Sequence, residues 1–222
     1  MSRHYFTLKI SRQRLIACVQ RPAGDETWSW DGTRWHFECA TNLPSSRRVF
    51  QMAHHAATDR IVLYGGDIGW AATYGDTFLL DAGNPSQASV TSFGAGCAGT
   101  AGTATLQAQG YPMLGTTFPS RLTNVPAGLA IFVVGFSDTQ WNAAPLPLPL
   151  GPIGLPPACN AYVSVDAVVW VPHTGVADYA LPIPCDPGLQ GLVLFVQGAG
   201  IDLGLTTPVP LVTSNALRMT LG

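Results

Sequence analysis

Serine, histidine and aspartate side chains are the residues of this sequence that could carry out catalysis. A serine hydrolase needs a Ser nucleophile, a His base and an acidic residue that orients the base. The weak candidates for this set are Ser137, His173, His54 and Asp138. The run Gly135 to Thr139 keeps only the first half of a Gly-x-Ser-x-Gly elbow. A turn at a strand end therefore explains Ser137 and Asp138 better than catalysis does, and His173 lies in a second expected turn.

Histidines could also bind a metal ion. His54 and His55, together with Asp59 or His36, offer the imidazole and carboxylate ligands that such a site needs. Adjacent residues of a strand point to opposite faces, so His54 and His55 should not reach one ion. We therefore expect no metal site and no cofactor.

Tryptophan and tyrosine are candidates for a binding surface, because aromatic rings offer a broad contact area to carbohydrates or apolar polymers. Trp28 and Trp30 alternate on one expected face and Trp35 follows a turn, which favours a packing role for these three. The better ligand-binding candidates are in expected loops: Trp70, Tyr74 and Trp141.

The chain has five cysteines: Cys18, Cys39, Cys97, Cys159 and Cys185. No Cys-x-x-Cys pair occurs, which argues against a zinc site of the common spacing. Cys97 and Cys159 both stand at the edges of expected elements, and we predict a disulfide between them, with buried free thiols as the alternative.

Composition excludes several classes of protein. Hydrophobic residues make up 47% of the 222 residues and charged residues 11%, with a net charge of −2. Such a chain is too apolar for disorder and has no basic excess for nucleic acid. No stretch reaches the roughly 18 apolar residues of a membrane helix, and residues 1–20 have no continuous apolar signal segment.

Charge is unevenly distributed along the chain. Residues 91–222 contain only two arginines and five aspartates, whereas the shorter first part carries the other charges. This shift predicts two domains, 1–88 and 89–222, with the boundary near Asn84 to Gln87.

Strand patterns dominate both parts, and helical periodicity is nearly absent. Thr27 to Trp30 and Arg34 to Phe37 flank an Asp31-Gly32 turn, which predicts a hairpin. A second hairpin is expected from Val49–His54 and Arg60–Tyr64, followed by a strand over Thr77–Leu80.

The first part resembles a bacterial kelch repeat over about residues 15–82. The matching segments are Asp25 to Trp35, Pro44 to Arg48, Met52 to His54, Asp59 to Gly66 and Asp76 to Phe78. The Thr of Glu26-Thr27-Trp28 recurs as Thr77 about 50 residues later, which is the kelch period. The resemblance implies a β-propeller blade, with Gly65-Gly66 ending a strand. Arg47 and Arg48 are expected to form salt bridges with Asp59, Asp67 and Asp76.

The match covers about one and a half blades, whereas a propeller closes a ring of four to eight. The ligand surface of the family therefore cannot be transferred to this chain. A lone blade must also pack on another surface: the second half, another copy, or a further part of the protein.

The second part predicts a β-sandwich, jelly-roll or Ig-like, on which the kelch-like blade packs. Six prolines between Pro145 and Pro157 exclude a central strand there. The predicted strands are 104–109, 116–122, 129–136, 161–165, 168–171, 177–181, 191–197, 211–213 and 216–221.

This part resembles C-terminal domains of large secreted bacterial proteins. The resemblance rests on Phe93 to Gly99, Gly135 to Thr139, Leu181 to Pro187 and Ser214 to Gly222. It implies an extracellular or cell-surface setting and no catalytic residue.

The sequence thus predicts a non-catalytic, secreted or surface protein for binding or assembly, with a carbohydrate or polymer as ligand. A hydrolase acting on esters or glycans, with a site at the domain boundary, is the alternative. We expect no nucleic-acid partner and no membrane span. Unpaired strand edges and the low charge predict a homo-oligomer or a part of a longer chain.

Overall fold

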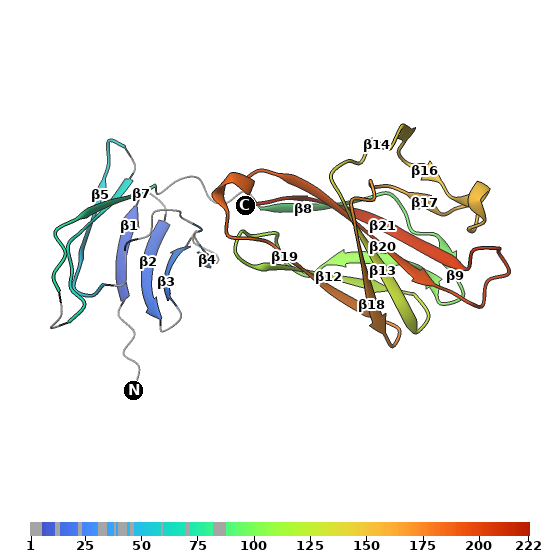
Figure 1. The fold of residues 1–222 in the computed structure, drawn as a ribbon, viewed down its shortest axis with the longest axis horizontal. Helices are drawn as coiled ribbons and strands as arrows, with labels where there is room; N and C mark the ends of the chain where they lie inside the picture. The colour runs from blue at the N-terminus through green and yellow to red at the C-terminus, as the bar shows by residue number, and fades with distance from the viewer. Residues whose placement is uncertain are drawn as a thin grey trace. The chain divides into compact units, whose positions relative to one another are not determined.

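The computed structural model describes residues 6–11, 14–21, 24–30, 35–37, 39, 44, 47–58, 60–69, 72–81 and 88–222. Over these residues the chain is all-β, with antiparallel sheets and no α-helix (Figure 1). This confirms the predicted all-β class. No helix in this part of the chain could cross a membrane.

The chain divides into two compact units. Unit 1 comprises Met1–Gln87, Met113–Gly115 and Pro184–Gln190, and unit 2 comprises Ala88–Pro112, Thr116–Ile183 and Gly191–Gly222. The expected boundary segment, Asn84 to Gln87, lies outside the described residues.

Unit 1 contains two antiparallel sheets with simple up-and-down order, β1-β2-β3-β4 and β5-β6-β7. In the predicted first hairpin Trp30 pairs with Trp35, and in the second His55 pairs with Arg60. The strands are β1 (Phe6–Ser11), β2 (Arg14–Arg21), β3 (Gly24–Trp30), β4 (Trp35–Phe37), β5 (Gln51–His55), β6 (Arg60–Tyr64) and β7 (Thr77–Asp81).

A buried arginine organises the end of the β5-β6-β7 sheet. Arg47 donates to the Gly65 carbonyl at 3.1 Å and to Asp76 Oδ2 at 2.9 Å. Its guanidinium lies 4.3 Å from the centre of the Tyr74 ring and 4.9 Å from that of Phe78. The hydrogen bond from Arg47, with its positive charge, holds the pKa of Asp76 below its usual range. A buried guanidinium needs such partners, which makes Arg47 structural.

Arg48 forms the second expected ion pair, with 3.7 Å between its Nη2 and Asp67 Oδ1. The backbones of the two residues also exchange hydrogen bonds, at 2.7 and 2.8 Å. Asp59, the third expected carboxylate, lies outside the described residues.

Unit 2 is built on a five-stranded sheet, β18-β13-β20-β21-β8, and a three-stranded sheet, β11-β12-β19. The strands of the larger sheet are β8 (Ser89–Phe93), β13 (Gly128–Gly135), β18 (Ala167–His173), β20 (Val193–Ile201) and β21 (Leu211–Thr220). Those of the smaller sheet are β11 (Thr105–Ala108), β12 (Thr117–Thr123) and β19 (Ala177–Pro182). The runs 211–213 and 216–221, expected as two strands, form the single strand β21.

The two sheets of unit 2 face one another, and the side chains between them form a core. On β12, Phe118 and Leu122 are fully buried while Arg121 is exposed, which is the period of two of a strand with one covered face. A Cβ atom at Gly198 of β20 would lie 2.9 Å from Leu122 Cδ1, so glycine allows the close approach. The ring centres of Phe132, on β13, and Tyr179, on β19, are 5.0 Å apart.

The proline-rich connection between β13 and β18 joins neither large sheet, as its prolines predict. It contains only the two-residue strands β14 (Gln140–Trp141), β15 (Ala144–Pro145), β16 (Leu148–Pro149) and β17 (Asn160–Ala161), and the 3-10 turn η1 (Gly151–Ile153). The remaining short elements are β9 (Ala98–Gly99), β10 (Gly102–Thr103) and the 3-10 turn η2 (Pro187–Leu189).

The end of this connection covers part of the second face of the five-stranded sheet. Gln197, buried on β20, donates to the Asn160 carbonyl at 2.9 Å and accepts from the Tyr162 N–H at 2.8 Å. Val163 packs there with Phe195 and Ala216. The predicted strand 161–165 is therefore mostly an irregular covering segment, because a glutamine side chain replaces its strand partner.

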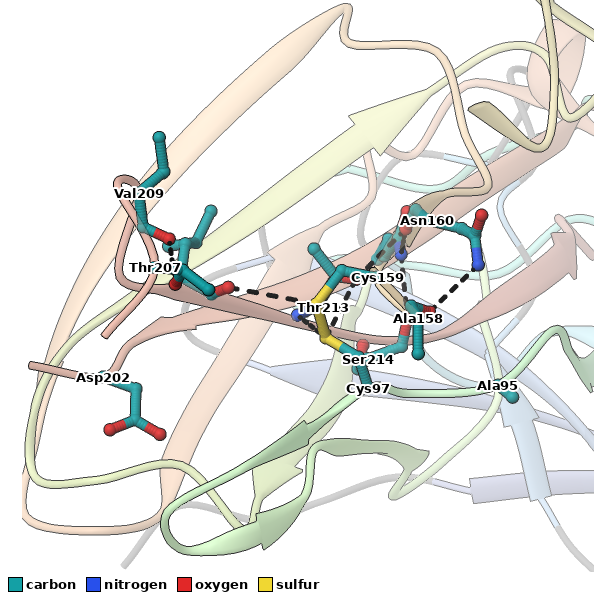
Figure 2. Close-up of a disulfide and its surroundings, with 12 residues drawn as sticks. Ala95, Cys97, Ala158, Cys159, Asn160, Asp202, Thr207, Val209, Thr213 and Ser214 are labelled. Atoms are coloured by element: carbon teal, nitrogen blue, oxygen red, sulfur yellow. Dashed lines mark hydrogen bonds between the residues drawn. A yellow bond between two sulfur atoms is a disulfide. The ribbon is translucent and has the colours of Figure 1, made fainter. Parts of the chain in front are cut away.

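Two disulfides join four of the five cysteines: Cys39 with Cys185, and Cys97 with Cys159. Figure 2 shows the second bond, which is the one expected from the sequence, beside Thr213 and Asn160. The Thr213 N–H donates to Cys97 Sγ at 3.1 Å, and Thr213 Oγ1 donates to the Asn160 carbonyl at 3.1 Å. The bond thus fixes the covering segment to β21. Two disulfides are consistent with an oxidising extracellular or periplasmic compartment.

Candidate functional site

Unit 2 has a groove between the edge strands β8 and β11. It has a volume of about 560 Å³. Its lining residues are Val90, Ser92, Gly94, Thr105, Leu106, Gln107, Ala108, Asn215 and Leu217. We call this set the neutral groove, because it contains no charged side chain.

The groove exists because the five-stranded sheet is wider than the three-stranded sheet that faces it. Val90 and Ser92 belong to β8, which is the last strand of the larger sheet, and Ser92 is exposed while Val90 is half-buried. The smaller sheet ends at β11, so no further strand of the described chain lies over these residues. A strip on the core side of β8 therefore stays open to solvent.

Asn215 closes the free edge of β11. The Leu106 N–H donates to Asn215 Oδ1 at 2.8 Å, and Asn215 Nδ2 donates to the Leu106 carbonyl at 3.0 Å. One carboxamide thus makes both hydrogen bonds that a neighbouring strand would make to Leu106. This edge is closed to a peptide strand at that point.

The remaining polar groups of the groove are hydroxyls and a second amide. Ser92 Oγ accepts from Asn215 Nδ2 at 2.7 Å, so its own hydrogen can be donated to a ligand. Thr105 Oγ1 donates to the Thr103 carbonyl at 3.0 Å and keeps its acceptor capacity. Gln107 is exposed at the rim and offers both a donor and an acceptor.

Four of the five aspartate carboxylates of residues 91–222 are used in structural contacts. Asp166 accepts from Ser164 Oγ at 2.6 Å and from the Phe136 N–H at 2.8 Å, and these bonds lower its pKa. Asp186 accepts from the Gly188 N–H at 2.9 Å and so caps η2.

Asp202 is completely buried in a loop. Burial raises its pKa, but hydrogen bonds from Thr100 and from the Gly204 N–H outweigh burial, so the pKa is lower than usual. A carboxylate held ionised by such donors organises the loop and is a poor proton donor near neutral pH.

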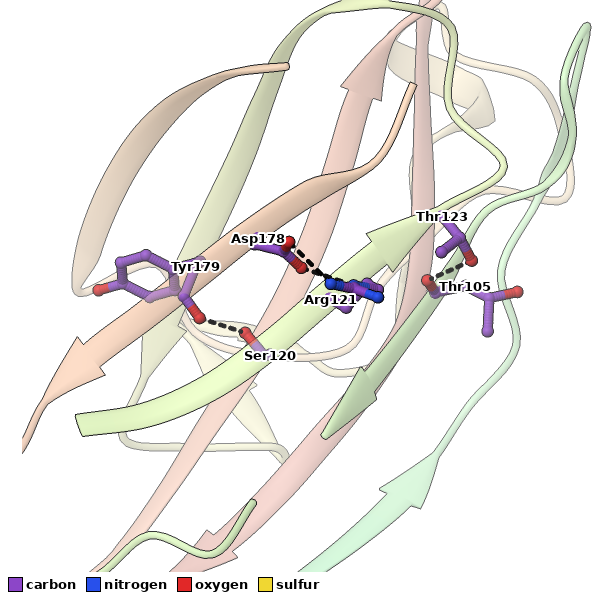
Figure 3. A network of polar contacts seen from close by, with 6 residues as sticks. All are labelled: Thr105, Ser120, Arg121, Thr123, Asp178 and Tyr179. Carbon is purple, nitrogen blue, oxygen red and sulfur yellow. Dashed lines mark hydrogen bonds and ion pairs between the residues drawn. The ribbon is translucent and has the colours of Figure 1, made fainter. Parts of the chain in front are cut away.

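Arg121 and Asp178 form an ion pair on the outer face of the three-stranded sheet (Figure 3). They stand opposite each other on β12 and β19, and the two N···O distances are 2.7 and 2.9 Å. The hydrogen bonds and charges of the pair raise the pKa of Arg121 and lower that of Asp178. The pair is exposed, and cross-strand pairing is a sufficient explanation for it.

The candidate catalytic residues are separated along β13. Ser137 lies just beyond the end of this strand, and His173 pairs with Gly128 at its start. Seven residue steps of strand put the two roughly 20 Å or more apart. Ser137 Oγ instead accepts from the N–H groups of Thr139 and Gln140, as a turn residue does.

His173 and Asp138 make no contact with Ser137 that would support catalysis. His173 Nδ1 accepts from the Gly175 N–H at 3.1 Å, and burial lowers the pKa of this histidine. Asp138 is half-buried in the turn after β13. Ser137 and Asp138 thus lie in the turn after β13, whereas His173 is the half-buried last residue of strand β18 and not part of the turn expected there.

His54 lies on β5 in unit 1, where it pairs with Ile61. His55 is exposed, and its Nδ1 is 2.8 Å from Thr58 Oγ1. His36 is on β4, which belongs to the other sheet of unit 1. Among the residues that the structure describes, no three His, Cys, Asp or Glu side chains gather as metal ligands do.

The aromatic binding candidates do not form one platform. Trp70 lies outside the described residues. One face of the Tyr74 ring is occupied by Arg47. Trp141 is half-buried on β14, which pairs with β15 in unit 2. Of the tryptophans expected to pack, Trp30 and Trp35 lie with ring centres 5.6 Å apart.

Sequence reasoning missed the neutral groove. One available signal was Asn215, which is followed directly by the apolar Ala216 and Leu217 near the end of the chain, because a buried amide requires a hydrogen-bond partner. The identity of that partner, the Leu106 backbone 109 residues away, depends on tertiary structure.

Comparison with protein-family models, curated proteins and solved structures finds no match to this chain. Its function must therefore be argued from the geometry described above.

Proposed function

We propose that this protein is a non-catalytic binding protein, secreted or exposed at the cell surface, and that it binds a neutral carbohydrate in the neutral groove. The observation that carries the proposal is the lining: uncharged amide and hydroxyl groups beside the apolar Val90 and Leu217, in a cavity of about 560 Å³. Ligand sites have this mixture of apolar walls and few polar groups.

A neutral, polyhydroxylated ligand suits these groups best. Its hydroxyls exchange hydrogen bonds with Ser92, Thr105 and Gln107, and its C–H faces cover the apolar side chains. A charged ligand would lose hydration without gaining an opposite charge. A peptide strand is disfavoured, because Asn215 occupies the hydrogen bonds of Leu106.

The wider architecture stays part of the proposal. The interpretation of unit 2 as a jelly-roll or Ig-like sandwich is supported by its two facing sheets. The kelch-like interpretation of unit 1 is a hypothesis that rests on its sequence motifs, and no propeller ring occurs among the described residues. Secretion is supported by the two disulfides.

Titration of the whole chain against neutral, acidic and basic oligosaccharides, by calorimetry, tests the proposal. We expect binding to a neutral saccharide, weakened about 3- to 10-fold by Gln107→Ala or Ser92→Ala, because each variant removes one hydrogen bond to the ligand. The control is Gln140→Ala, an exposed glutamine of unit 2 outside the groove, which should bind as the wild type does.

The same samples should be assayed with generic ester substrates. Turnover that a single Ser→Ala or His→Ala change abolishes would establish the hydrolase alternative. The proposed site would be contradicted if neither groove variant weakened saccharide binding, or if the protein bound no saccharide at all.

A further inference from the structure

The outer face of the five-stranded sheet is covered unevenly. The covering segment around Tyr162 and Val163 protects β20, β21 and β8, and its contacts extend as far as Val133 of β13. On the side of Val133 that leads to β18, the face is exposed to solvent. Trp170 is 54% exposed and Val168 is 44% exposed, both on β18.

The strand register defines the open area. Leu129, Ile131 and Val133 of β13 stand opposite Pro172, Trp170 and Val168 of β18. These six residues share one face, and it points away from the smaller sheet because the alternate residue Phe132 contacts Tyr179 there. We call the six residues the Trp170 strip.

The strip lies along the edge of the sheet. β18 pairs with β13 on one side, and no strand of the described chain pairs with its other side. Its seven residues, Ala-Val-Val-Trp-Val-Pro-His, include no Lys, Arg, Asp or Glu. Charged residues usually protect such an edge from association, and here Pro172 alone serves that purpose.

We propose that the Trp170 strip is the surface through which two copies of this chain associate about a two-fold axis. Trp170 is the central residue of β18, so an antiparallel arrangement of two copies places Trp170 opposite Trp170. It also places Val168 opposite Pro172 of the second copy. A two-fold interface of this kind uses the same patch on both copies.

Charge favours a second copy as the occupant. The strip brings no like charges together, and Asp166, next to β18, would lie opposite Thr174. The two Asp166 carboxylates would then be about 26 Å apart along the strands, well beyond the screening length of about 8 Å. A carbohydrate is disfavoured, because the indole N–H of Trp170 is the one side-chain group of the strip that could hydrogen-bond the hydroxyls of a sugar.

The size of the strip predicts a weak dimer. Stable interfaces bury about 800 Å² on each partner, which is more than three exposed and three half-buried side chains provide. We expect a concentration-dependent dimer with a Kd above about 1 μM. Each dimer would carry two neutral grooves, and its formation does not depend on what they bind.

Sedimentation velocity over a concentration series of the whole chain is the test. Trp170→Lys should make the protein monomeric throughout, because it places two ammonium groups together at the axis. Leu203→Lys, which alters an 82% exposed leucine outside the strip, should leave the dimer unchanged. Circular dichroism spectra should show that both variants fold.

A charge-swap series tests the two-fold arrangement itself. Val168→Glu alone and Pro172→Lys alone should each weaken the dimer. The double variant should restore it, because each Glu then faces a Lys of the other copy. Three results would overturn the proposal: a monomeric wild type, an unaltered dimer in Trp170→Lys, or a double variant that dimerises no more tightly than the single variants. Binding of another protein to the strip would not rescue it.

Discussion

In unit 2, two side-chain amides make backbone hydrogen bonds at places where no neighbouring strand supplies them. Asn215 makes both edge hydrogen bonds of Leu106, and Gln197 holds Asn160 and Tyr162 over the opposite face. Both side chains are buried on strands of the five-stranded sheet. A carboxamide can do this because it carries a donor and an acceptor, as a peptide group does.

Replacement of Asn215 by alanine should therefore destabilise the protein. Asn215→Ala leaves the buried Leu106 N–H and carbonyl without their partner, which should lower the free energy of unfolding by about 2 kcal/mol or more. Urea denaturation measures the change. Asn160→Ala, which removes only a hydrogen bond to the Ala158 carbonyl, should cost much less. Equal losses of unfolding free energy in the two variants would contradict this role of Asn215.

His173 should make stability depend on pH. Burial lowers its folded-state pKa below the unfolded value of about 6.5. The unfolded chain then binds more protons, so this contribution is present above about pH 6.5 and is lost as the pH falls through the folded pKa.

Urea denaturation at about pH 7.5 and about pH 5.5 measures this loss, because ordinary carboxylates stay ionised at both values. The wild type should lose more stability than His173→Asn between these values. His55→Asn, which changes an exposed histidine, should lose as much unfolding free energy as the wild type does. The same pH response in wild type and His173→Asn would exclude His173 as its source.

At the scale of elements, local signals were sufficient for hairpins. The Asp31-Gly32 turn signal and the two strand-like runs Val49–His54 and Arg60–Tyr64 predicted β3-β4 and β5-β6, because a two-stranded pairing across a short turn depends on nearby residues. The segment 161–165 misled the same reasoning. Its apolar residues are buried or half-buried by packing on the face of a sheet, and a segment covered in this way has the same apolar pattern in the sequence as a strand.

The Cys97–Cys159 disulfide should be what keeps that segment in place. It closes a separation of 62 residues, for which chain entropy predicts about 4 kcal/mol of stabilisation. The double variant Cys97→Ala/Cys159→Ala should be less stable by about that amount. Amide exchange of Tyr162, whose N–H donates to Gln197, should become faster.

The matched control is Cys39→Ala/Cys185→Ala, which removes the disulfide that lies within unit 1. It should leave the exchange of Tyr162 unchanged. If both double variants accelerated this exchange equally, the local role of the Cys97–Cys159 bond would be refuted.

At the scale of the molecule, the low charge of residues 91–222 has a structural meaning. Asp166, Asp178, Asp186 and Asp202 each bond to nearby backbone or side-chain donors. The two surfaces for which we propose partners, the neutral groove and the Trp170 strip, contain no charge. Neutral partners are therefore expected at both surfaces: a saccharide where amides and hydroxyls gather, and a second copy where only apolar side chains lie.

The sequence by itself determined the all-β class, the two hairpins of unit 1 and the exclusion of the proline-rich connection from the large sheets. Turn residues, alternation and proline act over a few positions, so they can be recognised locally. Only the tertiary structure decided that five strands face three, that Asn215 meets Leu106 and that Trp170 stays open. Each of these depends on which distant strands become neighbours, and that choice is made by packing of the whole unit.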